Sequence, residues 1–99
     1  MRNYFFTKLS DINFRIATHE GNANRRLASQ AVKILLLPTT EVPDKYKKEF
    51  LELRQLVEIT IKNLIVPGLT PVKLHGIQNR MAVKFIKLLL LIEDEMRDK

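Results

Sequence analysis

Large apolar side chains recur every three or four residues along this chain, and that spacing constrains its fold more than any other feature. An α-helix turns once in about 3.6 residues, so this spacing gathers the side chains on one face. In the first segment the stripe consists of Phe5, Leu9, Ile12 and Ile16. A half-buried strand would alternate at every second residue instead, and the segment shows no such alternation. The pattern predicts an all-α protein.

Glycine and proline divide the chain into four segments, each of which is expected to form one helix. A glycine after a helix supplies a left-handed cap, and a proline cannot donate the next hydrogen bond. Gly21, Pro38 and the pair Pro67-Gly68 are therefore expected to end the first three helices. The expected helices run from 3 to 19, from 23 to 37, from 43 to the 67–68 pair and from 71 to 96. Their predicted start signals are Asn22 for the second, Pro43 for the third, and Thr70 with Pro71 for the fourth.

A length of 99 residues suits a single domain, covering 1–99. The predicted architecture is a four-helix bundle, or an irregular four-helix array, with a long C-terminal helix. A continuous helix over 71–96 would be about 39 Å long at about 1.5 Å per residue. That exceeds the roughly 26 Å expected from twice the radius of gyration of such a domain. Gly76 is therefore expected to mark either a bend or a later start of this helix.

The C-terminal helix carries more apolar side chains than one buried face needs. Beside its main stripe lie Val83, Ile86, Leu90 and Leu91. A helix that is apolar nearly all round is either central or part of an interface. The sequence favours the interface, so we expect a homodimer or a helical protein partner that contacts these four residues. Residues 35–37 and Phe14 show a similar excess of apolar surface.

The sequence lacks the residue patterns that enzymes and metal sites need. It contains no cysteine, and its two histidines, His19 and His75, lack the spacing of a metal-binding pair. Its carboxylates alternate with lysines or crowd at the C-terminus, so no pair is expected in one desolvated cleft. Neither a nucleophilic serine motif nor a glycine-rich phosphate loop is present. We therefore expect a non-enzymatic protein without cofactor or bound metal.

The distribution of charge also bears on location. A membrane span needs about 20 apolar residues, and Lys87 interrupts the most apolar stretch, residues 85–92. Near the N-terminus Lys8 and Asp11 interrupt what would be the apolar core of a signal peptide. The sequence therefore predicts a cytoplasmic protein without a membrane partner.

Two basic features of the chain suggest a surface for an acidic partner, in keeping with its net charge of +6. The first is a polar group at the start of the second helix: Asn22, Asn24, Arg25, Arg26, Ser29 and Gln30. Arginine and amide side chains suit contacts to base edges, although Asn22 is also a typical helix cap. The second is a ribbon on the last helix, formed by Lys73, Arg80, Lys84 and Lys87. It could follow a phosphate backbone, or it could be the solvated side of an amphipathic helix.

Two functions follow from these patterns. The leading one is a helical interaction or regulatory protein that self-associates through apolar helix surfaces. The alternative is a small nucleic-acid-binding protein that uses the basic turn at 22–30 and the basic ribbon. The position of the cations distinguishes the two functions, because convergence of the cations on one face would favour nucleic-acid binding.

Overall fold

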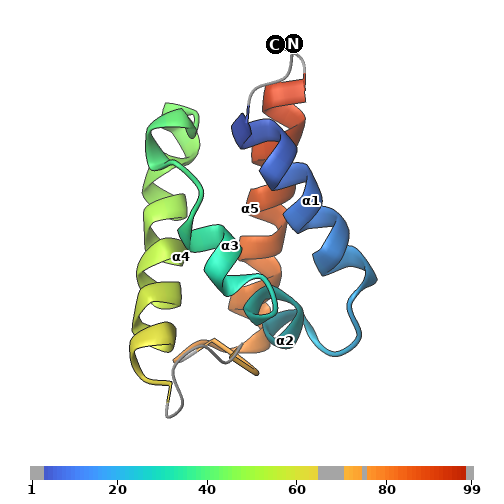
Figure 1. Cartoon of the computed structure of the whole chain (residues 1–99), viewed down its shortest axis with the longest axis vertical. Helices are drawn as coiled ribbons and strands as arrows, with labels where there is room; N and C mark the ends of the chain where they lie inside the picture. The colour runs from blue at the N-terminus through green and yellow to red at the C-terminus, as the bar shows by residue number, and fades with distance from the viewer. Residues whose placement is uncertain (1–3, 65–70, 75, 98–99) are drawn as a thin grey trace.

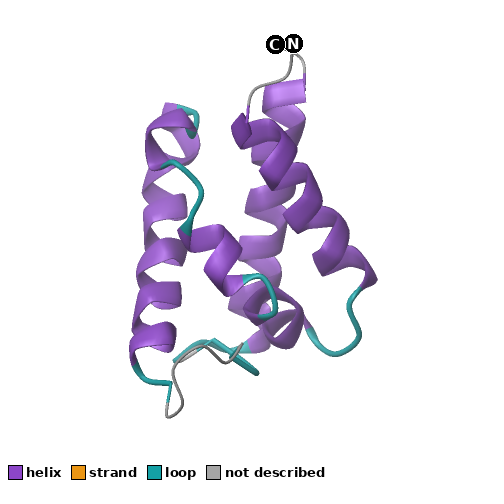
Figure 2. Ribbon diagram, viewed as in Figure 1, coloured by secondary structure: helices purple, strands orange, loops and turns teal. Residues whose placement is uncertain are grey.

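The computed structural model describes residues 4–64, 71–74 and 76–97, and within these ranges the regular structure is entirely helical (Figures 1 and 2). The expected Pro67-Gly68 terminator, Thr70 and His75 lie outside the described residues. The α-helices within them are α1 (Tyr4–Thr18), α2 (Ala23–Ala28), α3 (Ala31–Leu35), α4 (Asp44–Lys62) and α5 (Asn79–Arg97), with a 3₁₀ turn, η1, at Thr39–Glu41.

The first helix and the turn after it agree with the sequence pattern. Phe5, Leu9, Ile12 and Ile16 are all buried on one face of α1. Gly21 has a φ of +108°, a conformation that disfavours any side chain. Asn22 then caps α2, and its side-chain oxygen accepts a hydrogen bond from the backbone N–H of Arg25.

The helix expected over 23–37 is two shorter helices, and this prediction was wrong. Ser29 and Gln30 form a turn between α2 and α3. The Ser29 hydroxyl donates to the carbonyl of Arg26 at 2.6 Å, a local hydrogen bond that competes with helical pairing. The turn redirects the chain while Leu27 and Ile34 remain in the core. A four-helix bundle is accordingly not confirmed.

Helix α4 begins one residue after Pro43, which has the extended ψ of 140°. Asp44 lies in its first turn, where a carboxylate complements the positive end of the helix dipole. Phe50, Leu53 and Val57 face the core.

The C-terminal helix starts at Asn79, so the expected start at Pro71 was wrong and the later start after Gly76 was correct. Pro71 instead lies buried in the connecting segment, outside any helix. Gly76 has a φ of +76°, which reverses the chain before α5 begins. With 19 residues, α5 is about 28 Å long, which is close to the size expected of the domain.

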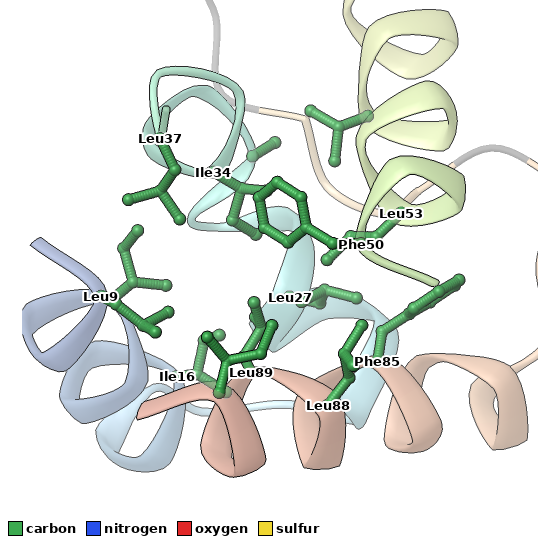
Figure 3. Packing of buried hydrophobic residues seen from close by; sticks show 14 of the residues in the cluster. Leu9, Ile16, Leu27, Ile34, Leu37, Phe50, Leu53, Phe85, Leu88 and Leu89 are labelled. Atoms are coloured by element: carbon green, nitrogen blue, oxygen red, sulfur yellow. The ribbon is translucent and has the colours of Figure 1, made fainter. Parts of the chain in front are cut away.

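Helix α5 is the central element of the fold. It packs against α1, α2 and α4, and in Figure 1 it runs between α4 and α1. Its buried side chains are Ala82, Phe85, Leu88, Leu89 and Ile92. Figure 3 shows several of these side chains meeting residues of α1, α2, α3 and α4 in one cluster. The apolar character of the last helix thus reflects, in part, contact with three neighbours.

Gly76 offers a direct test of the connection that precedes α5. We expect Gly76→Ala to lower the free energy of unfolding by about 1–2 kcal/mol, because an alanine at this φ brings its Cβ too close to the following carbonyl. Apart from Gly76 and its two chain neighbours, no residue has an atom within 4 Å of the added Cβ, so the cost would arise from the local backbone. Urea denaturation measures it. The control Gly76→Asn should cost less, and equal costs would contradict this explanation.

Candidate functional site

Apolar side chains of α5 that lie outside the buried core line a groove between α5, α1 and the start of α2. The groove encloses about 440 Å³. Helix α5 lines it with Val83, Ile86 and Leu90, which lie at spacings of three and four residues. Ile16 and Ala17 of α1 and Ala23 of α2 line the opposite wall. We call this feature the α5 groove.

The α5 groove continues toward the C-terminal end of the helix. Leu90 and Lys87 also line a second, shallower hollow of about 460 Å³, which includes Leu91. Leu90 is 50% exposed and Leu91 is 52% exposed, so both offer apolar surface to solvent. The four residues predicted as an interface, Val83, Ile86, Leu90 and Leu91, therefore lie along one connected surface.

Buried asparagine side chains fix both ends of the groove. Near one end Asn13 of α1, which is 5% exposed, donates to the Leu89 carbonyl at 3.1 Å and to Glu93 Oε1 at 2.7 Å. Ser10 donates to the other Glu93 oxygen at 3.1 Å. The Arg97 guanidinium also contacts that carboxylate, at 2.8 Å. These contacts hold α1 against α5, so the wall of the groove is preformed.

At the other end Asn24 connects α2 to the segment that leads into α5. Its Oδ1 accepts from the Leu74 N–H at 2.6 Å, and its Nδ2 donates to the carbonyls of Leu74 and Ile77 at 3.4 and 3.3 Å. Asn79, the first residue of α5, accepts from the Asn24 N–H at 3.1 Å. Asn24 is therefore a structural clamp that places the start of α5 beside α2.

The residues of the predicted nucleic-acid surface have different environments. Asn24 and Gln30 are buried, each 7% exposed, so they are not available to contact a partner. The side chain of Asn22 caps α2. Arg26 lines the α5 groove from α2, and Lys87 lines it from α5. Four further predicted contact residues are exposed but do not line the groove: Arg25, Lys73, Arg80 and Lys84.

Arg80 and Lys84 lie farther round α5. They share a separate hollow of about 310 Å³ with Gly76, Ile77 and Met81. At spacings of four and three residues, Arg80, Lys84 and Lys87 occupy one face of α5, next to the apolar residues of the groove. The structure thus places Arg26 and Lys87 on the two walls of the groove, whereas Arg80 and Lys84 line a separate hollow on the neighbouring face of α5.

Another hollow, between α1 and α3, is smaller and its charges are already satisfied. It encloses about 240 Å³ and is lined by Tyr4, Lys8, Asp11 and Lys33 among others. The Arg15 guanidinium hydrogen-bonds the Asp11 carboxylate, and together with nearby Lys33 it lowers the pKa of Asp11. The Lys8 ammonium lies 5.4 Å from the centre of the Tyr4 ring. The charged side chains of this hollow therefore already interact with groups of the protein itself.

Within the described ranges, no group of three side chains suits a metal ion, and no helix is long and apolar enough to cross a membrane. His19 is exposed just after the end of α1. No catalytic arrangement of side chains lines the α5 groove, whose polar residues are Asn13, Arg26, Asn79 and Lys87.

Sequence reasoning located the groove residues of α5 but missed the asparagine clamps. The sequence predicts Asn24 as a contact residue because amide side chains suit base edges, whereas the structure buries it. The burial of Asn13 could have been predicted from the sequence. Asn13 follows Phe6 by seven residues, so it lies on the same side of α1 as this buried residue. No known protein family matches this chain, and the curated proteins and solved structures likewise yielded no match.

Proposed function

We propose that this protein is a non-enzymatic interaction module that binds an amphipathic helix of a partner protein in the α5 groove. The observation that carries the proposal is the exposed apolar surface along α5. Val83, Ile86 and Leu90 lie at positions i, i+3 and i+7, so they form one apolar face of α5 along the groove, and a hydrophobic groove of this kind accepts the apolar face of an amphipathic helix. Exposed apolar residues that are contiguous and bordered by polar ones are typical of interaction sites.

The shape of the site supports a helix as the occupant. From Asn79 to Leu90 the groove follows α5 for about 16 Å, or three turns of helix, at about 1.5 Å per residue. One wall is α5 and the other is formed by α1 and α2, and both ends of this framework are held by hydrogen bonds. A preformed apolar channel avoids much of the ordering cost of binding.

The proposed partner is a different protein and not a second copy of this chain. In a dimer joined groove to groove, Arg26 and Lys87 of both copies would lie in one interface, and like charges disfavour such a contact. The nucleic-acid alternative is weakened by the burial of Asn24 and Gln30, which removes two of its base-reading side chains. A helix from a different protein meets neither objection.

A synthetic peptide tests the proposed function. The probe is a helix-forming peptide of about 18 residues with one leucine stripe and glutamine elsewhere, close to the length of α5. We expect it to bind the full chain, and we expect Leu90→Asp to weaken binding at least about tenfold, because a carboxylate would be buried against leucine. Fluorescence anisotropy of the labelled peptide gives the affinity.

Leu51→Asp is the matched control. Leu51 lies on α4 outside the groove and is 46% exposed, close to the 50% of Leu90. Both variants should remain folded, because a substitution at an exposed position changes stability by only about 0.5 kcal/mol. Equal weakening by the two variants, or no binding of the peptide, would overturn the proposed function.

A further inference from the structure

Six cations on and around α2 and α5 lack a carboxylate partner within the described part of the chain. They are Arg25, Arg26, Lys73, Arg80, Lys84 and Lys87, and none of them takes part in an ion pair there. Elsewhere in the same ranges, cations such as Arg15, Lys45 and Arg97 do pair with carboxylates. Lys8 of α1 and Lys48 and Lys62 of α4 are also outside these ion pairs, so six of the nine unpaired cations in the described ranges lie on or beside α2 and α5.

The origin of this concentration is visible in the sequence. Neither residues 21–40 nor residues 71–92 contain an aspartate or glutamate. The fold places these two segments side by side, since α2 packs against α5. The acids of α5 begin at Glu93, and that residue and Glu95 are engaged by Arg97 and Lys45. Arg26 on the α2 wall and Lys87 on the α5 wall therefore give the α5 groove a cationic rim on each side of its apolar residues.

We infer that the helix bound in the α5 groove carries carboxylates on both sides of its apolar stripe. On one side they face Arg26 of α2, and on the other they face Lys87, with Lys84 and Arg80 beyond it. This inference rests on the proposed function and adds the chemistry of the partner. Complementary charge at a rim accelerates association and excludes partners of the wrong sign.

An acidic helix fits this site better than a nucleic acid does. A phosphate backbone needs cations along an accessible polar surface, whereas Arg26 and Lys87 lie beside the apolar residues that line the groove. An acidic amphipathic helix satisfies both features, because its apolar stripe covers the apolar residues of the groove while its charged flanks meet Arg26 and Lys87. Duplex DNA is consequently the competing ligand in the test.

Three peptides that share one leucine stripe and differ only in the charge of their flanking residues show how much that charge contributes to binding. Their flanking positions are all glutamate, all glutamine or all lysine, and each is titrated into the full chain at about 50 mM and about 500 mM salt. At low salt we expect the glutamate peptide to bind about tenfold more tightly than the glutamine peptide, because several exposed ion pairs, each of small effect, would form along the two rims. The difference should shrink at high salt, where screening is strong.

Charge reversal on both rims provides the decisive comparison. In the double variant Arg26→Glu/Lys87→Glu the glutamate peptide should lose its advantage over the glutamine peptide, because both cations that line the groove become carboxylates. The control Lys48→Glu/Lys62→Glu makes the same change in net charge on exposed α4 residues that do not line the groove. It should preserve the original order. Circular dichroism of both variants checks that they are folded.

The outcomes distinguish the inference from the proposed function. If all three peptides bind equally at low salt and Leu90→Asp still abolishes binding, the groove binds a helix but the acidic partner is wrong. If none of them binds, the proposed function fails as well. If a duplex DNA of about 20 base pairs binds more tightly than the glutamate peptide and the rim variant weakens it, the acidic helix is also wrong.

Discussion

Replacing Leu89 with alanine should lower the free energy of unfolding by about 2–5 kcal/mol. Leu89 is fully buried on α5, the helix that contacts α1, α2 and α4. Its truncation would open a cavity at the point where these helices meet, which their side chains could fill only in part. A small domain has only about 5–15 kcal/mol of stability in total, so a loss of this size could bring the variant close to unfolding.

Urea denaturation followed by circular dichroism measures this effect. Leu91→Ala is the control, because Leu91 is on the same helix but is 52% exposed. We expect it to cost less than about 1 kcal/mol. Similar losses from the two substitutions would mean that α5 is not buried on the face assigned to it.

Replacing Asn24 with alanine is expected to cost about 2–3 kcal/mol, because each buried polar group left without a partner costs about 1–3 kcal/mol. The most affected group is the Leu74 N–H, which donates to Asn24 Oδ1 at 2.6 Å from a residue that is 1% exposed. The carbonyls of Leu74 and Ile77 would lose their contacts with Nδ2 as well. The connection into α5 would loosen more than the helices themselves.

Hydrogen exchange of the Leu74 amide, measured beside the urea denaturation, tests this local effect. In Asn24→Ala the amide should exchange much faster, because its acceptor is gone. Asn22→Ala removes an exposed cap at the start of the same helix and should cost about 1 kcal/mol. It should leave the Leu74 amide protected. Unchanged exchange in Asn24→Ala would contradict the role of Asn24 as a clamp.

Local signals in the sequence were sufficient to predict most of the helices. The stripe of α1, the cap at Asn22 and the break at Pro38 depend on neighbours in the chain, and the structure agrees with them. The start of the last helix was misplaced because Pro71 satisfied a local rule. Burial of Pro71 and Leu74 against the core, and the hydrogen bonds from Asn24, take that segment out of the helix. Such contacts between distant residues leave little trace in a local pattern.

The candidate site was predictable on one side only. Helical periodicity separated Val83, Ile86 and Leu90 from the buried stripe, and these residues line the groove. The opposite wall comes from α1 and α2, more than fifty residues earlier in the chain, and their approach depends on tertiary packing. The same contact places Arg26 and Lys87 on the two walls of the groove, which could not be inferred from either basic segment alone.

The most direct measurement of the central claim is the set of intermolecular NOEs between the leucine-stripe peptide and methyl groups of the protein. We predict NOEs from the peptide leucines to Val83, Ile86 and Leu90, which line the α5 groove. Exposed apolar residues on other elements, such as Leu36 of the α3–η1 connection and Leu51 of α4, should show none. NOEs confined to Leu36 or Leu51, with none to the groove residues, would contradict the assignment of the α5 groove as the binding site.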